Sequence, residues 1–414
     1  MRVPEPLHLS SFRRLAFTYT VNELSWAFGT VALGILVFDR TGSAVATTAL
    51  FLLTTFVPAI VGPPLTARLD HLAIRRALPA LYVAEAAVFA ALALLTGAFW
   101  LPAVLALALV DGAIALVARA LTRAAVASAL EPSGSLEAGN RLLNVCSWAG
   151  YAVGPAVAGL VVAQAGVAAS LWITTGLFAL IMAALATCRT LPAAHGEGDR
   201  SWRARLAESV RWVSGERTVM AVLAAHGAAT AFLAFGMPIE VVYVEKALGA
   251  GSFAYGLLLT AWGAGTVVSS LVLARARGGS ALALIPVTAA MMGAGYLIMA
   301  AAPSVALAAA GCLIGGLGNG VYVVSVIQAI QDRVPSDMQA RVMSLFESLT
   351  AGAFGVGFLA AGAIAALAGT RVAYGVAAIG VLLSAAAIGV VLRERAVAGA
   401  APRAGLSSAA EPAG

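Results

Sequence analysis

Long apolar runs separated by short polar connections repeat along the whole chain of 414 residues. The runs are rich in Ala, Leu, Val and Gly, show no alternation of period two, and reach the roughly 20 residues that a helix needs to cross a bilayer. They must be helices, because lipid offers no hydrogen-bond partner to unpaired backbone groups. The pattern predicts twelve membrane spans, at residues 14–38, 44–67, 77–98, 101–126, 140–163, 168–188, 219–243, 252–274, 281–301, 304–330, 342–366 and 372–392.

Composition points to the same class of protein. Hydrophobic residues make up 61% of the chain, charged residues only 11%, and the mean hydropathy is +0.94. A water-soluble protein of this length needs more charge to cover its surface. The chain is therefore expected to be an all-α, polytopic membrane protein that lies in the lipid bilayer.

The basic residues predict the orientation, because Lys and Arg are enriched in loops on the cytoplasmic side. With both termini in the cytoplasm, all but three of the 25 basic residues fall inside, and Arg40, Lys246 and Arg371 fall outside. The net charge of +6 then reflects topology rather than nucleic-acid binding. The first run carries Glu23 and lacks a small-residue cleavage site, so a signal anchor and a multi-pass place in the inner (plasma) membrane are expected.

The longest polar connection, residues 189–217, divides the predicted spans into six and six. Within it Trp202, Leu206, Val210 and Val213 recur at helical spacing, which predicts an amphipathic helix on the inner membrane surface. The expected units are residues 1–188, the linker 189–217, residues 218–395 and a disordered tail at 396–414. Two six-helix halves in the same orientation predict a parallel repeat around a central cavity.

Acidic residues interrupt the apolar runs, although an ionised side chain at the membrane centre costs about 2.5 to 3.5 kcal/mol on insertion scales. Such groups seldom face lipid, so several are expected to border the cavity, where burial favours the protonated carboxyl group and allows proton exchange. Polar and aromatic neighbours would bind a bulky ligand. The candidate substrate and proton-coupling residues are Asn22, Glu23, Trp26, Glu85, Asp111, Asn144, Asn319, Gln328 and Glu347. The alternative, a structural pair of each carboxylate with Arg119 or Arg123, stays open.

Other polar residues in the runs favour simpler roles. Glu240, near the outer end of the seventh span, is expected at the membrane interface, and His226, without a spaced partner, as a packing residue. The three cysteines lie within spans without a C-x-x-C pair, so neither a disulfide nor a metal site is expected, and no cofactor is predicted.

The energy source is inferred by exclusion. The only lysine is Lys246, so the chain has no G-x-x-x-x-G-K-[ST] phosphate loop for ATP. Ion gradients remain, and one charge moving through about 100 mV supplies about 2.3 kcal/mol.

Several stretches, in this order and spacing, resemble one family. They are "FDRTGSA" (38–44), the loop 62–78, "ARALTRAAVASALEP" (118–132), "NRLLN...GPAVAG" (140–159), "YGLLLTAWGAG" (255–265) and "QDRVPSDMQARVMSL" (331–345). The chain resembles the major facilitator superfamily of secondary transporters, and most of all its drug-and-siderophore exporter branch, which includes macrolide efflux proteins. The resemblance covers nearly the whole chain.

The loop 62–78 resembles the signature loop between helices 2 and 3 of this superfamily, an acid followed by a basic cluster. The resemblance implies a cytoplasmic gate in which the acid meets the start of helix 11, and the helix dipole favours that contact. The implied gate residues are Asp70, His71, Arg75, Arg76 and Arg341. Read without the family, the same charges are positive-inside anchors.

A second motif, in span five, is similar to the one associated with antiporters and exporters. It consists of Gly150, Gly154, Pro155 and Gly159. Its small face lets another helix approach closely, and the proline favours a bend. Within this fold the motif favours export.

These observations predict a proton-coupled antiporter that exports an amphipathic small molecule such as a drug, an antibiotic or a siderophore, and that works as a monomer. A proton-coupled uptake symporter is the main alternative, and a non-transporting membrane sensor is disfavoured because the loops are short. An enzyme is not expected, because neither a paired-His metal motif nor G-x-S-x-G is present.

Overall fold

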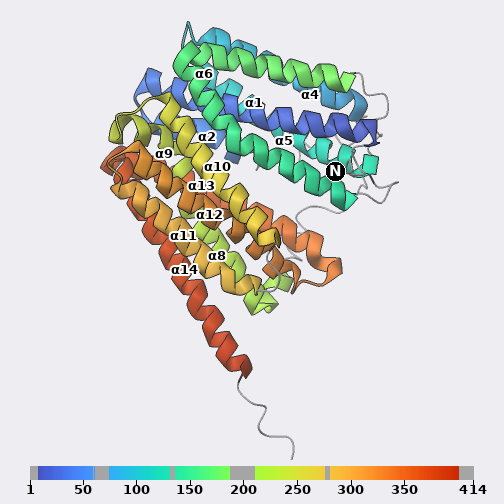
Figure 1. Ribbon diagram of the computed structural model, residues 1–414, viewed down its shortest axis with the longest axis vertical. Coiled ribbons are helices and arrows are strands. Elements are labelled where there is room, and N and C mark those ends of the chain that lie inside the picture. Colours follow the sequence, from blue (N-terminus) through green and yellow to red (C-terminus); the bar gives the residue numbers. More distant parts are fainter. Residues whose placement is uncertain are drawn as a thin grey trace, which may run out of the picture.

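The computed structural model describes residues 8–58, 60, 74–130, 136–186, 210–275 and 280–400. Every regular element among them is helical (Figure 1). The first half of the chain forms α1 (Ser10–Thr41), α2 (Ala44–Phe51), the π-helix η2 (Leu52–Phe56), α4 (Ile74–Leu95), α5 (Leu101–Leu130) and α6 (Leu136–Ala186). The second half forms α8 (Arg217–Leu233), α9 (Gly236–Val242), the π-helix η4 (Tyr243–Ala247), α10 (Ser252–Arg275), α11 (Ala281–Ala301), α12 (Val305–Gln331), α13 (Ser336–Ala368) and α14 (Thr370–Ala400).

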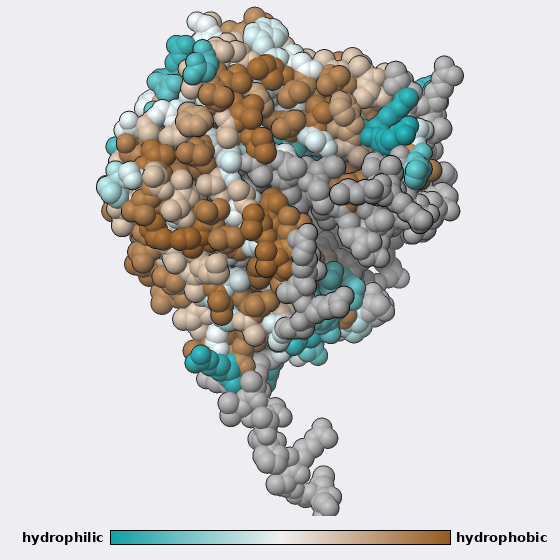
Figure 2. Space-filling view, viewed as in Figure 1, coloured by the Kyte–Doolittle hydropathy of each residue, from teal (hydrophilic) through white to brown (hydrophobic). Residues whose placement is uncertain are grey.

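The helices form two bundles that meet along one side. Figure 1 shows α1, α4, α5 and α6 together in one bundle, and α8 with α11 to α14 in the other. Helices α2, α9 and α10 lie where the bundles meet. In the space-filling view, hydrophobic residues cover the middle of the visible face and hydrophilic residues lie toward its edges (Figure 2). An apolar belt of this kind suits a lipid environment.

Ten helices among the described residues are long and apolar enough to cross a membrane, so the expectation of an all-helical, multi-pass membrane protein is confirmed. The span predicted at 281–301 has the same bounds as α11, and the break predicted between the spans 77–98 and 101–126 falls in the connection between α4 and α5. The number of twelve crossings stays a prediction. One of the ten helices, α6, contains a break at Gly166, and the apolar helix Ala44–Phe56 is shorter than the rest.

Glycines in left-handed backbone conformations separate these helices where the chain has to turn. Gly42 (φ 61°) ends α1, and its amide donates to the Phe38 carbonyl, after which the Ser43 hydroxyl caps α2 by accepting from the Ala46 amide at 3.3 Å. Gly166 (φ 82°) interrupts α6. Residues with a Cβ rarely adopt this conformation, so both breaks are encoded locally.

The seventh predicted span is also broken, in the middle of the molecule. Helix α8 ends at Leu233, a turn follows, and α9 starts at Gly236. Pro238 lies in the first turn of α9, where its missing amide is tolerated. The freed Leu233 carbonyl accepts a hydrogen bond of 2.6 Å from the Tyr296 hydroxyl, so a neighbouring helix satisfies the break.

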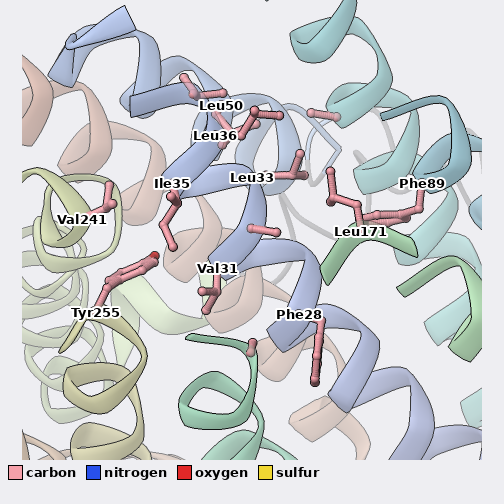
Figure 3. Packing of buried hydrophobic residues seen from close by; sticks show 14 of the residues in the cluster. Phe28, Val31, Leu33, Ile35, Leu36, Leu50, Phe89, Leu171, Val241 and Tyr255 are labelled. Carbon is pink, nitrogen blue, oxygen red and sulfur yellow. The ribbon is translucent and has the colours of Figure 1, made fainter. Parts of the chain in front are cut away.

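The contacts that join the two bundles lie toward the end where α1 meets α2. Figure 3 shows Val241 and Tyr255 of the second half beside Ile35 of α1. The rings of Phe51 in α2 and Phe358 in α13 also meet edge to face, with centroids 6.5 Å apart. We call this the closed end, defined by Asp39–Gly42 and Glu245–Lys246. Figure 1 shows the bundles diverging from there toward the end where α1 begins.

The predicted linker and tail fall mainly on parts of the chain that are not described, namely residues 187–209 and 401–414. Residues 210–215 of the linker are helical, and Val213 is buried against the second bundle. The division of the chain into the four predicted units stays a prediction.

Candidate functional site

A cavity of about 550 Å³ lies between the two bundles. Side chains of α1, α2, α4 and α5 line it on one side, and side chains of α8 to α14 line it on the other. Its volume is in the range of sites that bind small molecules, which are mostly apolar with a few fixed polar groups. The central cavity between the two bundles is thus present, and its polar groups are the candidates for function.

The polar stripe predicted on α1 lines this cavity. Asn22, Glu23 and Trp26 are half-buried and belong to the lining, together with Gly29 one turn further on. Residues three and four apart share a helix face, which explains why the four side chains reach one space. Gly29 leaves room for Phe89, whose ring atoms would lie 2.8 Å from an added Cβ. The stripe therefore places a carboxyl, an amide and an indole in the first bundle.

Glu85 of α4 and Asp111 of α5 form a carboxyl pair at the wall of the cavity. The two side chains share a hydrogen bond, both line the cavity, and Glu85 is only 1% exposed. Gly112 lets α5 approach η2 closely, because an added Cβ there would overlap the Thr54 carbonyl oxygen of η2. A hydrogen bond between two carboxyl groups exists only when one of them holds a proton. The pair can therefore share a proton within the apolar wall of the cavity.

Arg119, two turns after Asp111 on α5, completes this site. Its positive charge acts on both carboxyl groups, and it lines the cavity. Within the described part of the chain, neither the buried Nε atom of Arg119 nor Oε2 of Glu85 has a hydrogen-bond partner. Arg123, the other predicted partner, is exposed. Of the two arginines considered from the sequence, Arg119 is the one near the acids.

The second bundle contributes Asn319 and His226 to the lining. The Asn319 amide donates to the Thr266 hydroxyl at 3.5 Å. His226 Nε2 lies 3.0 Å from the Thr350 hydroxyl, and its ring stacks on Phe346 with centroids 4.5 Å apart. His226 is thus a packed side chain, as expected, and it also faces the cavity.

Glu240 is not at the membrane interface, so this expectation was wrong. The side chain is 7% exposed and lines the cavity. The break before α9 explains the difference, because Gly236 and Glu240 occupy the same face of the new helix, one turn apart, and both reach the cavity. The nearby "VEKALG" makes the position look like a span end in the sequence, whereas "FGMP" (235–238) is the signal of the break.

Two other candidates lie outside the lining. Gln328 is exposed and lies on the face of α12 opposite Asn319, nine residues away. Glu347 is exposed as well, although it shares a face of α13 with Thr350 and Phe354. It lies one turn beyond them, toward the end where the bundles diverge. Glu347, selected as an acid within an apolar run, therefore does not border the cavity as expected.

The remaining candidates fall on residues or side chains that are not described. The backbone of Asn144 belongs to α6 and that of Arg341 to α13, but their side chains are not described. Asp70 and His71 lie outside the described residues. Arg75 and Arg76 are exposed in the first turn of α4. The cytoplasmic gate stays a prediction.

The comparison with protein families decides what kind of molecule encloses this cavity. A family model described as "transmembrane secretion effector" matches residues 4–407, nearly the whole chain. The chain belongs to the transmembrane secretion effector family. No curated protein sequence matches this family member at a significant level.

Solved structures with the same fold are transporters. The nucleoside transporter NupG superposes with a TM-score of 0.75 at 13% identity, over 92% of this chain and 99% of NupG. A POT family transporter in complex with a thioalcohol-conjugated peptide gives 0.76 at 11%, over 92% and 96%, and the POT family transporter PepTSo gives 0.74 at 10%, over 96% and 99%. This secretion effector family member thus belongs, by its family model, to the major facilitator type of membrane transporter, and it has the fold of these solved structures. Its branch within the superfamily stays a prediction.

In this transporter the glycine motif of α6 packs on two sides. An added Cβ would lie 2.9 Å from Glu23 Cβ at Gly150 and 2.6 Å from Ala27 Cβ at Gly154, so α1 approaches closely. On the other side Gly159 meets Gly256 of α10, with an added Cβ 3.1 Å from its Cα. The Ala156 amide, next to Pro155, donates to the Thr260 hydroxyl at 2.9 Å. The motif thus joins the polar stripe of α1 to the other half of the transporter.

Charged groups hold the closed end of the transporter. Lys246 Nζ donates to the Gly42 carbonyl at 2.9 Å and lies 5.2 Å from the centroid of the Phe38 ring. Asp39 and Glu245 share a hydrogen bond across the two halves. As in the cavity, this bond needs one proton between two carboxyl groups, and ionisation of both replaces attraction with repulsion.

The closed end is therefore expected to loosen as the pH on its side rises, because the shared proton is lost. Glu245→Gln donates a hydrogen bond to Asp39 at any pH, so it should remove at least half of this response. Spin labels at the exposed residues Val45 and Phe253 measure it as a distance across the closed end. Asp332→Asn, an exposed acid at the far end of α12, serves as the control. A wild-type response in Glu245→Gln would contradict the role of the pair.

Proposed function

We propose that this protein is a proton-coupled antiporter that exports an amphipathic small molecule. The observation that carries the proposal is the Glu85–Asp111 carboxyl pair beside Arg119 at the wall of the central cavity. A site that holds one proton in an apolar wall and faces the substrate space combines the two requirements of such a carrier.

The charge balance of the site supports exchange. With one shared proton the pair carries a single negative charge, which Arg119 neutralises. Uptake of a second proton leaves one positive charge in the cavity wall, and loss of the shared proton leaves one negative charge. Charges in such a wall are weakly screened, so the protonation state changes the affinity of the cavity for a charged ligand. Proton binding and substrate binding are thereby linked.

The chemistry of the cavity lining supports the proposal that the substrate is amphipathic. Rings from both bundles, among them Phe51, Trp262 and Phe354, surround the cavity together with the polar groups. The matched structures are a nucleoside transporter and transporters bound to peptide derivatives or 5-aminolevulinic acid, all of them with small organic ligands or substrates. The family description, a secretion effector, and the exporter-like glycine motif favour export over uptake.

The same proposal includes twelve crossings, both termini in the cytoplasm and a monomer in the plasma membrane. The break at Gly166 supports two crossings within α6, and the apolar helix Ala44–Phe56 supports one more than the ten long helices. Labelling of cysteines introduced in successive connections, from either side of the membrane, tests this topology.

Everted membrane vesicles test the function. Vesicles from cells with the protein, energised to be acid inside, are expected to accumulate members of a panel of macrolides and lipophilic dyes above the level of control vesicles. Collapse of the proton gradient should abolish the difference. Accumulation that persists after collapse would contradict proton coupling, and movement of substrate in the same direction as protons would identify an uptake symporter instead.

A further inference from the structure

Glu240 is a buried acid that the proton site does not use. It lies on α9, in the bundle opposite the Glu85–Asp111 pair, and it lines the cavity. Within the part of the chain that the structure describes, its carboxyl group receives one hydrogen-bond contact, a long one of 3.9 Å from the Cys312 thiol. A thiol is a weak donor and does not compensate for burial of a carboxylate. The group therefore has unused capacity to bind a ligand.

Four aromatic rings form a continuous row beside this carboxyl group. Ring centroids are 5.0 Å apart from Tyr243 to Tyr374, 5.2 Å from Tyr374 to Tyr296 and 5.6 Å from Tyr296 to Trp262. Glu240 lies close enough to Tyr243 and Tyr374 to act on both electrostatically when it is ionised. We call these four residues the aromatic row; all except Tyr243 line the cavity.

Hydrogen bonds to backbone carbonyls fix two of the three tyrosine hydroxyl groups of the row. The Tyr243 hydroxyl donates to the Met299 carbonyl and the Tyr296 hydroxyl donates to the Leu233 carbonyl, each at 2.6 Å. Among the described residues, the Tyr374 hydroxyl has no hydrogen-bond partner, although the side chain is fully buried and lines the cavity. A buried unpaired hydroxyl is costly, so it points to a ligand that completes the site.

The basic side chains of this part of the protein are engaged elsewhere. Lys246 binds the Gly42 carbonyl at the closed end. Arg371 donates to the carbonyls of Ala300 and Ala247 and lies 5.9 Å from the Tyr243 ring centroid. Neither completes an ion pair with Glu240. A metal ion is not favoured, because the described residues contain no group of three or more His, Cys, Asp or Glu that could hold one.

We propose that Glu240 and the aromatic row bind the cationic end of the substrate, which is then an amphipathic organic monocation. A carboxylate attracts such a group in a weakly screened cavity, and aromatic faces bind it further through cation–π interactions. The apolar part of the ligand lies against rings of the lining outside the row, namely Phe51 of the first half and Phe354 of the second. This inference rests on the proposed function and adds a division of labour: the first bundle binds the proton and the second bundle binds the substrate cation.

Binding to the full-length protein in nanodiscs tests the inference without any gradient. The probes are methyltriphenylphosphonium and the neutral triphenylphosphine oxide, which have nearly the same shape and differ in charge. Equilibrium dialysis, with empty nanodiscs subtracted, gives both dissociation constants. The wild type is expected to bind the cation about tenfold more tightly than the oxide, and Glu240→Gln should remove this preference while binding the oxide within about twofold of the wild type.

Further variants separate charge from packing. Glu240→Asp keeps the charge and should retain part of the preference. Tyr374→Leu removes a ring of the row and should weaken binding of the cation more than binding of the oxide. Tyr374→Phe keeps the ring, so it should bind the cation more tightly than Tyr374→Leu does. Asp332→Asn is the control for a lost acid outside the cavity.

Two results would overturn the inference. One is equal binding of both probes by the wild type, and the other is an equal loss of binding affinity for both probes in Glu240→Gln and in Glu240→Asp. A cation preference that depends on Glu240 in a protein that moves no substrate with a proton gradient would contradict the proposed function alone. Gradient-driven transport without that preference would contradict the inference alone.

Discussion

Asp111→Asn is expected to reduce substrate-driven proton movement by about tenfold or more, because the remaining carboxyl group can no longer release and regain a proton. The amide side chain of this variant still hydrogen-bonds to Glu85, so the geometry of the wall is kept. Glu85 then stands as a single carboxyl group beside the Arg119 cation, without the second acid with which it shares a proton. The site loses the step in which it takes up a proton.

Glu85→Gln is expected to act in the same way, since it leaves Asp111 as the single partner of Arg119. The double variant should be no worse than either single one, because both remove the same shared proton. Proton movement is measured with a pH-sensitive dye in proteoliposomes after addition of a transported compound. Binding of that compound without a gradient shows that each variant is folded.

The matched control is Asp332→Asn, an Asp-to-Asn change at an exposed site at the end of α12. It should leave proton movement within about twofold of the wild type. Normal coupling in both Asp111→Asn and Glu85→Gln would exclude the pair as the proton site. Glu23, the other acid of the first bundle in the lining, would then be the next candidate.

The sequence predicted the helices and part of the site because both follow from the cost of burial in lipid. Apolar runs of this length have to be helices, and acids within them have to face a cavity or a partner. Glu23, Glu85 and Asp111 satisfy this rule, and all three line the cavity. The contact between Glu85 and Asp111 joins two helices, and spacing within one chain segment does not predict which faces of two helices meet.

The second bundle was less predictable for two physical reasons. The break before α9 turns Glu240 toward the cavity. A hydropathy pattern does not reveal such a break when the segments on both sides of it are apolar. Tyrosines such as Tyr296 and Tyr374 look like ordinary packing residues in the sequence, because no polar side chain that pairs with their hydroxyl groups marks them. The Tyr296 hydroxyl donates to a backbone carbonyl, and the Tyr374 hydroxyl has no partner among the described residues. Gln328 is polar within a span, but only the packing of α12 shows that it lies away from the cavity.

Gly256→Ala is expected to have the largest effect on conformation, because Gly256 lies where α10 of one half meets α6 of the other. An added Cβ would overlap the carbonyl oxygen of Pro155 and lie 3.1 Å from Gly159 Cα. Both neighbours are backbone atoms, which do not move aside as a flexible side chain does. Overpacking of this kind costs about 1 to 3 kcal/mol, a factor of about 5 to 150 in an equilibrium constant.

This contact joins the halves near the closed end, so the overpacking destabilises the conformation in which that end is shut. If the halves rock as rigid bodies, a wedge at Gly256 opens the closed end and brings the divergent end together. Spin labels at Arg123 and Gln331, exposed residues of α5 and α12 toward the divergent end, should therefore report a shorter distance in Gly256→Ala.

Gly176→Ala is the control for this change, since Gly176 lies on α6 and has no atom within 4 Å of an added Cβ. It should leave the label distance and the melting temperature unchanged. A Gly256→Ala protein with a lower melting temperature but the wild-type distance would show that the close approach stabilises the fold in every conformation. The glycine pair would then be a fixed pivot of the transporter, and the rocking motion would have to occur around it.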